Sequence, residues 1–264
     1  ANPSGRTAAA LNAAIAAAAY DIIIRVDGHA LIPSDYVAIA VETLEATGAD
    51  NVGGIMGAEG TSDFEKAVAA AMTSWFGVGG AAFHIGGEAG PALTVYLGCF
   101  RRSALMRVGG FDESMVRAQD WELNHRIRQS GGLVWFTPDL RVTYRPRNSL
   151  RALAKQYFEY GRWRREVARR HPETVSWRYL APPVTLIAVA GGSVVGLAGL
   201  AAGSRVVAAL GFLMPLGYAT ANLAASLLAS RDLPARSARS LPAVFATMHG
   251  AWGAGFIIGA RHRQ

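Results

Sequence analysis

The 264-residue chain has little of several features that would direct its fold or location. Cys99 is the only cysteine, so no intramolecular disulfide can form, which fits a reducing cytosolic environment. We find no signal-peptide pattern and no internal repeat. Charge is almost missing from residues 180–230, where Arg205 is the only charged residue. A stretch of this kind favours membrane helices over a soluble domain.

A net charge of +7 and a pI of about 10.0 first suggest a nucleic-acid partner. The sequence, however, has no zinc-finger, recognition-helix or RNA-binding-sheet motif. Its arginines instead cluster next to the apolar region. This placement favours a membrane surface, and no nucleic-acid partner is expected.

The first part of the chain alternates between helix and strand patterns, which predicts an α/β layered domain over residues 1–148. We expect a buried parallel strand at 21–26. A turn is expected at Gly53–Gly54, and a helix over the sheet edge at 63–76. The glycine-rich residues 77–90 predict a loop. Further helices are predicted at 6–19, 34–46, 103–108 and 120–129, and further strands at 94–101 and 133–136.

Asp27 and His29 follow directly on the first predicted strand. Side chains at the carboxyl end of a strand project into the crevice where ligands bind in open α/β folds. A carboxylate and an imidazole there would suit a divalent metal, and the imidazole accepts Mn²⁺ better than Mg²⁺. The simpler alternative is an Asp-Gly turn that ends the strand.

Asp120 lies in the first turn of a predicted helix, after the turn Gly109-Gly110-Phe111-Asp112-Glu113. The positive end of the helix dipole would keep this carboxylate ionised and ready to act as a base. Alternatively, Asp120 only caps the helix.

The last part of the chain predicts a membrane region at 180–264, preceded by a basic amphipathic region at 149–179. In the basic region, Ser149 is a plausible N-cap, and arginines and aromatic residues follow an apolar stripe, as in helices that lie on an anionic leaflet. Spans are expected at 183–202 and 206–229, and residues 241–260 could span or lie in the interface. Arginines flank both ends of the expected hairpin, which predicts that these flanks and residues 1–148 face the cytoplasm.

Taken together, several motifs resemble the inverting bacterial glycosyltransferases of family 2, most closely the succinoglycan-type, ExoA-like group. The motifs are Ala10-Leu11-Asn12, Arg25-Val26-Asp27-Gly28-His29-Ala30, Val108-Gly109-Gly110-Phe111-Asp112-Glu113, Gln119-Asp120-Trp121-Glu122-Leu123-Asn124, Tyr160-Gly161-Arg162-Trp163-Arg164 and His249-Gly250-Ala251-Trp252-Gly253.

The resemblance implies a GT-A-like, Rossmann-related mixed sheet followed by transmembrane helices. It also implies a nucleotide-sugar donor, specifically a UDP-sugar, a divalent Mg²⁺ or Mn²⁺ ion, and a polyprenyl-linked glycan acceptor. The enzyme would work at the cytoplasmic face of the inner membrane, in contact with membrane lipids. Residue by residue, it assigns proton abstraction to Asp120, metal binding to Asp27 and His29, donor diphosphate binding to Asp27, His29 and Arg162, and acceptor contact or support to Glu122, Arg126 and Trp163.

The sequence departs from the family pattern at several positions. His29 stands where an aspartate is usual, and Gln119 replaces the usual glutamate before Asp120. Five residues separate Gln156 from Arg162, where polysaccharide synthases have two. The early nucleoside-binding segments of the family are not found either. We therefore expect the chain to be N-terminally incomplete, and to be a poor enzyme by itself.

Three other functions fit some of these features. A processive polysaccharide synthase would normally show the shorter Gln–Arg spacing and more spans. A non-catalytic, membrane-anchored scaffold of a polysaccharide assembly complex would explain the substituted motifs, whereas the presence of both Asp27 and Asp120 weighs against it. A nucleic-acid-binding protein is the least favoured.

Overall fold

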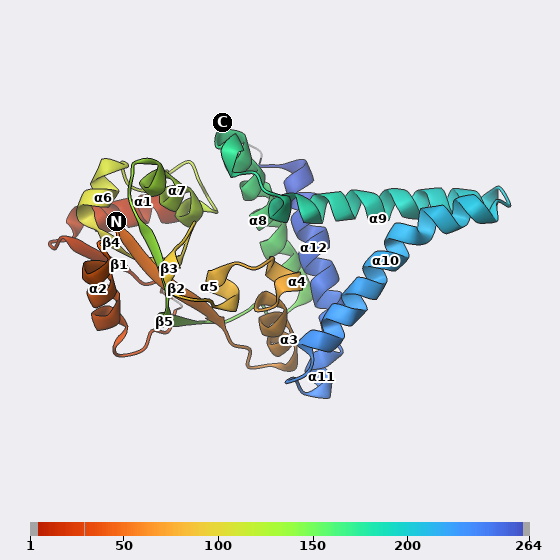
Figure 1. The fold of residues 1–264 in the computed structure, drawn as a ribbon, viewed down its shortest axis with the longest axis horizontal. Coiled ribbons are helices and arrows are strands. Elements are labelled where there is room, and N and C mark those ends of the chain that lie inside the picture. Colours follow the sequence, from red (N-terminus) through yellow and green to blue (C-terminus); the bar gives the residue numbers. More distant parts are fainter. Residues whose placement is uncertain (1–4, 29, 261–264) are drawn as a thin grey trace. The chain divides into compact units, whose positions relative to one another are not determined.

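Two units make up the structure, a computed structural model that describes residues 5–28 and 30–260. The sheet unit comprises Ala1–Glu59 and Gly80–Arg145, and the helical unit comprises Gly60–Gly79 and Pro146–Gln264. The helical unit therefore includes a segment that the chain inserts between two parts of the sheet unit. The sequence pattern gives no sign of this insertion. Figure 1 labels the elements of both units.

The sheet unit is an α/β layer structure, as the sequence predicts. Its elements, in chain order, are α1 (Thr7–Ala17), β1 (Ile22–Arg25), α2 (Tyr36–Thr47), β2 (Asn51–Ala58), α5 (Ala82–Ile85), β3 (Gly90–Pro91), β4 (Tyr96–Arg101), α6 (Arg102–Arg107), α7 (Gln119–Gln129) and β5 (Val134–Tyr144).

The five strands form one mixed sheet in the order β1-β4-β2-β5-β3. Only β2 and β5 pair in parallel, and β1 pairs antiparallel with β4. The expectation that residues 21–26 form a buried parallel strand is therefore wrong, because β1 lies at the sheet edge and its residues are half-buried. This edge position leaves the end of β1 accessible.

Apolar side chains cover both faces of the sheet. On one face, residues of α1, α6 and α7 pack on β4 and β5, and the central side chains there are Ile15, Phe100, Leu105, Phe111, Leu123, Ile127 and Phe136. On the other face, α2 packs on β2, β4 and β5 through Tyr36, Leu44, Val52, Leu97, Cys99 and Leu140. Burial raises the pKa of the Cys99 thiol to about 12, so this cysteine is unreactive.

The expected turn at Gly53–Gly54 is wrong, because both glycines lie inside β2. Glycine is needed there for space: a Cβ on Gly54 would lie 1.8 Å from the carbonyl oxygen of Leu140, and one on Gly53 would lie 2.7 Å from that of Tyr96. The pairing of β2 with both neighbouring strands shifts register at this point. These glycines therefore mark a bulge with close backbone approach.

The helical unit contains the remaining elements, which are α3 (Asp63–Met72), α4 (Trp75–Val78), α8 (Leu150–Arg170), the short 3₁₀ helix Pro172–Thr174, α9 (Trp177–Ala201), α10 (Arg205–Ala229), α11 (Ala235–Ala238) and α12 (Leu241–Ile258). Within the described residues, three helical segments are long and apolar enough to cross a membrane: Trp177–Ala201, Arg205–Ala229 and Ala235–Ile258.

Residues 63–76, expected as one helix of the sheet domain, form α3 and the first part of α4, which belong to the helical unit. There α3 packs against α11 and α12, and α4 packs against α12. A capping box starts α3: Ser62 accepts from the backbone amide of Glu65, and the Glu65 carboxylate accepts from the amide of Ser62. Ser237 of α11 then donates to Asp63 at 2.9 Å.

The predicted hairpin is present as α9 and α10, whose contact is built from small residues. Gly192 and Gly196 of α9 are four residues apart, a spacing that lets transmembrane helices approach closely. A Cβ on Gly211 of α10 would lie 2.2 Å from the backbone nitrogen of Gly196. Glycine at 211 is therefore required by the helix contact.

We expect Gly211→Ala to lower the stability of the helical unit by about 1–3 kcal/mol, because the added methyl group must push two backbones apart. Gly217→Ala, on the same helix, is the matched control, since a Cβ there meets nothing within 4 Å. Thermal unfolding of the detergent-solubilised protein measures both. Equal melting temperatures for the two variants would contradict the observed packing.

Candidate functional site

The structure brings Asp27 and Asp120 together through Arg25, the last residue of β1. The Arg25 Nε donates to Asp27 Oδ1 at 2.9 Å, and its Nη1 donates to Asp120 Oδ1. The Arg25 side chain is only 9% exposed, whereas those of Asp27 and Asp120 are 26% and 39% exposed. A buried guanidinium thus holds two accessible carboxylates that are 93 positions apart in the sequence.

The sequence signalled the two carboxylates but not the arginine between them. In the sequence, Arg25 stands out only as part of a motif. The one sequence feature that points to Arg25 is that a charged residue ends an otherwise apolar strand. Its guanidinium also lies 5.8 Å from the ring centroid of Phe111, so the turn after α6 supports it from the side.

A buried amide chain fixes α7, the helix that carries Asp120. Asn51, at the start of β2, donates to the side-chain oxygen of Asn124 at 2.6 Å. Asn124 in turn donates to the hydroxyl of Thr94 at 3.0 Å. Both asparagines are buried, and buried polar pairs of this kind allow little variation in geometry. The first turn of α7 is therefore held at a defined place on the sheet.

Arg126 and Glu122 connect α7 to the Gly109–Gly110 turn. Arg126 forms a two-pronged ion pair with Glu122, at 2.6 and 2.7 Å, and donates to the carbonyls of Val108 and Gly110. This contact is consistent with the predicted supporting role of both residues. Whether either also contacts an acceptor stays a prediction.

Asn12 of α1 holds the other side of the same turn. Its side chain accepts from the amide of Phe111 and donates to the carbonyl of Phe111, both at 2.8 Å. Gly109 and Gly110 have φ values of 74° and 71°, a conformation that favours glycine. The motifs Ala10-Leu11-Asn12 and Gly109-Gly110-Phe111 thus contact each other, and the Phe111 ring of the second motif lies next to Arg25.

Asp120 does not cap α7, which excludes the simpler interpretation of this residue. Ala118 occupies the N-cap position, in the left-handed region with φ of 60°, and makes no side-chain cap bond. Burial raises the pKa of Asp120, Arg25 opposes this rise, and Asp27 adds to it. For Arg25, burial favours a lower pKa, but the two carboxylates outweigh burial and raise it.

Asp27 has the chemistry of a ligand for a divalent cation. It offers hard carboxylate oxygens at an accessible strand end, as Mg²⁺ and Mn²⁺ require. His29, the second expected ligand, lies outside the described residues. Among the described residues, Asp27 offers one carboxylate, which also accepts from Arg25, so the remaining ligands of such an ion would come from the donor and water.

Arg162 and Trp163 belong to the helical unit and are described within it. Arg162 donates to the carbonyl of Gly259 at 3.0 Å and to Glu159 at 2.9 Å, and Trp163 is buried. These contacts fasten α8 to the C-terminal end of α12. The expected roles of Arg162 at the donor and of Trp163 near the acceptor stay predictions.

The basic face of α8 makes many contacts inside the protein. Arg164 stacks 3.7 Å from the ring centroid of Tyr179, and burial lowers its pKa to about 10. Arg169 and Arg170 both donate to Glu166. The hydrogen bond from Arg169 is the main cause that lowers the pKa of Glu166 to about 2. The apolar stripe of α8 packs on α12 rather than facing outward. An interfacial position for α8 stays a prediction.

Comparison with known proteins identifies the family to which this chain belongs. The model of glycosyl transferase family 21 matches residues 6–254, and the chain belongs to that family. The mixed sheet followed by long apolar helices is consistent with a GT-A-like glycosyltransferase.

A similar individual protein is the succinoglycan biosynthesis protein ExoA of Rhizobium meliloti (strain 1021), which is 37% identical over 183 residues. The match covers 69% of this chain and 56% of the relative, so the chain spans little more than half of that protein. The predicted resemblance to the ExoA-like group is thereby confirmed.

Proposed function

We propose that this protein transfers a sugar from a nucleoside-diphosphate donor to a lipid-linked glycan acceptor, with inversion at the anomeric carbon. The product would enter exopolysaccharide or cell-envelope polysaccharide synthesis. The observation that carries the proposal is the joining of Asp27 and Asp120 by Arg25 at the accessible end of β1. Membership of the glycosyltransferase family and similarity to a succinoglycan biosynthesis protein support it.

Asp120 is the base in the proposed reaction. Its carboxylate accepts the proton of the acceptor hydroxyl while the hydroxyl oxygen attacks the anomeric carbon. The nucleoside diphosphate leaves from the opposite face of the sugar, and this single displacement inverts the configuration. Arg25 holds the base in place, and the contacts of Asn124 and Arg126 hold α7.

Asp27 would hold Mg²⁺ or Mn²⁺, together with His29. When bound, the ion neutralises charge on the leaving diphosphate. We further propose that the donor is a UDP-sugar and that the acceptor carries a polyprenyl chain. The three apolar helices would anchor the protein in the inner membrane, with the sheet unit in the cytoplasm.

Binding of UDP tests the donor site. In the full-length protein, we expect Mn²⁺ to tighten UDP binding, and Asp27→Ala to weaken the metal-dependent binding by about tenfold or more because a charge-bearing ligand is lost. Asp35→Ala, at an exposed carboxylate of the same unit that makes no cap bond, is the control. Isothermal titration with and without Mn²⁺ gives the dissociation constant of UDP under each condition. Metal-independent binding that is equal in all three proteins would refute the assignment of Asp27.

A further inference from the structure

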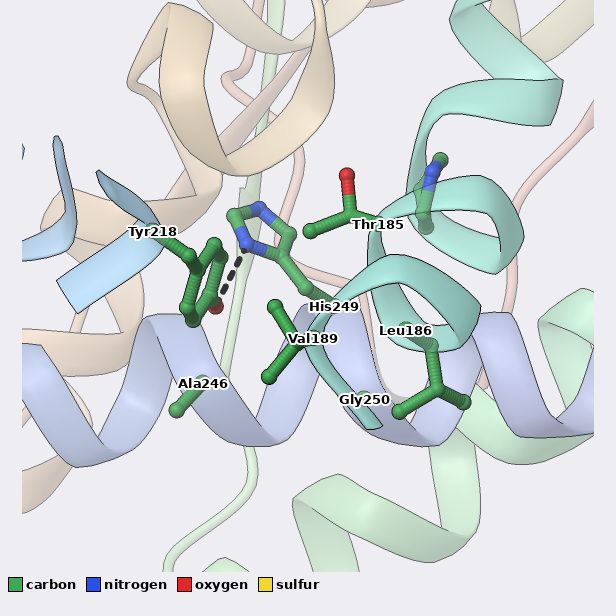
Figure 2. Close-up of a pocket in the computed structure, with 8 residues that line it drawn as sticks. Thr185, Leu186, Val189, Tyr218, Ala246, His249 and Gly250 are labelled. Carbon is green, nitrogen blue, oxygen red and sulfur yellow. Dashed lines mark hydrogen bonds between the residues drawn. The ribbon is translucent and has the colours of Figure 1, made fainter. Parts of the chain in front are cut away.

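A hollow lies between the three apolar helices of the helical unit, outside the site described above. It has a volume of about 100 Å³ and is lined by Pro182, Thr185, Leu186 and Val189 of α9, Tyr218 of α10, and Ala246, His249 and Gly250 of α12. Figure 2 shows these side chains converging from the three helices. Ala246 is exposed and the other lining residues are half-buried, so the hollow is open on one side.

Two of the polar side chains in this wall, Tyr218 and His249, contact each other. The Tyr218 hydroxyl is 3.0 Å from His249 Nδ1, the contact marked in Figure 2. His249 Nε2 is 2.8 Å from the carbonyl oxygen of Phe76. The simplest arrangement is a neutral imidazole whose Nε2–H donates to Phe76 while Nδ1 accepts from Tyr218. The rest of the lining is apolar apart from the Thr185 hydroxyl, and no charged side chain belongs to it, so the hollow suits hydrocarbon better than a sugar or a phosphate.

The position of the hollow along α9 places most of it within the leaflet where α9 begins. Residues 182–189 follow the start of α9 at Trp177 by 5 to 12 positions, which is about 8–18 Å at about 1.5 Å per residue. The hydrocarbon core of a bilayer is about 30 Å thick. Arginine-rich α8 precedes α9 and does not qualify as a span, so the chain before α9 stays on this same side.

We propose that this hollow binds a segment of a lipid hydrocarbon chain in the leaflet where α9 begins. An apolar cavity of about 150 Å³ holds benzene, so this volume accommodates about four carbon atoms, close to one isoprene unit or the end of an acyl chain. This inference rests on the membrane placement in the proposed function. It extends that function by naming where a lipid-linked acceptor, or a lipid beside it, places part of its chain.

The His249 contacts connect the hollow to the inserted segment 60–79. The Phe76 ring packs edge-to-face on the rings of Phe245 and His249, with centroids 5.2 and 4.8 Å apart. A chain in the hollow therefore lies against a wall that is bonded to α4. In the motif that begins at His249, the imidazole contacts Tyr218 of α10 and Phe76 of α4, and Gly250 lines the hollow beside it.

Photo-crosslinking tests this proposal without a need for activity. The full-length protein is placed in phosphatidylcholine–phosphatidylglycerol nanodiscs that contain either a diazirine-bearing polyprenyl phosphate or a diazirine-bearing phosphatidylglycerol. Mass spectrometry then locates the adducts. Ala246→Leu fills the hollow, and Gly191→Leu, at an exposed position of α9 where a Cβ meets nothing within 4 Å, is the matched control.

We expect adducts concentrated at residues 182–189 and 246–250. They should be strongly reduced in Ala246→Leu, because the leucine side chain takes the space of the hydrocarbon, and unchanged in Gly191→Leu. Concentration with the polyprenyl probe alone assigns the chain to an isoprenoid, and concentration with both probes assigns it to membrane lipids in general. Adducts spread evenly over the exposed helix surfaces, or unaffected by Ala246→Leu, would overturn the proposal. Absence of adducts from the exposed surfaces as well would overturn the membrane placement itself.

Discussion

Asp120→Asn is expected to lower kcat of sugar transfer by about 10²–10⁴-fold, the usual contribution of a general base. The amide keeps the size of the carboxylate but cannot take the proton of the acceptor hydroxyl. Donor affinity should change little, because the proposed metal and diphosphate contacts come from Asp27. Steady-state transfer assays on the full-length protein, with UDP titration alongside, separate the two effects.

Asp35→Asn is the matched control for this change, since it makes the same substitution at an exposed carboxylate of the sheet unit. It should keep full activity. Asp120→Glu adds a second test, because it keeps the charge and moves it by one methylene group. Full kcat in Asp120→Asn would exclude Asp120 as the base. It would also favour the scaffold alternative if Asp27→Ala were equally active.

The pattern of the sequence was sufficient for those parts of the fold that depend on local order. Helix and strand alternation predicted the α/β sheet unit, and the length of the apolar runs predicted the long apolar helices. The position of Asp120 in the first turn of a helix, after a glycine turn, could also be predicted. Each of these features depends on residues that are close together in the sequence.

Features that depend on contacts between distant residues could not be predicted in this way. The glycines at 53 and 54 resemble a turn in sequence, and only the closeness of Leu140 explains why a strand needs them. The segment 60–79 has the composition of an ordinary surface helix, yet it packs with the membrane-type helices, where His249 bonds to Phe76. Arg25 belongs to this group as well, since its role exists only where β1 and α7 meet.

Arg25→Gln is expected to lower kcat by about 10- to 100-fold, comparable to the cost of misplacing a reacting group by about 1 Å. Without the guanidinium, the carboxylates of Asp27 and Asp120 repel each other. Both side chains also lose the hydrogen bond from Arg25 that fixes their position. Arg25→Lys keeps the charge but cannot reach both carboxylates with a rigid fork, so it should restore activity only in part.

The pH dependence distinguishes this positioning role from a general loss of stability. Asp120 acts as a base only when ionised, and its pKa is raised by burial and held down by Arg25. Removing Arg25 raises the pKa of Asp120 further, so the acid limb of the kcat profile should move to higher pH. The deficit of Arg25→Gln should therefore shrink as the pH rises, and Arg25→Lys should show a smaller shift.

Arg102→Gln provides the comparison with a purely structural arginine. Arg102 donates to the carbonyls of Ala18 and Tyr20, just before β1. Its loss should reduce stability without moving the acid limb. If Arg25→Gln behaved in the same way, with lower stability and an unshifted pH profile, Arg25 would be a structural residue only. A shifted acid limb confined to the Arg25 variants would instead connect the edge strand to the proton transfer at Asp120.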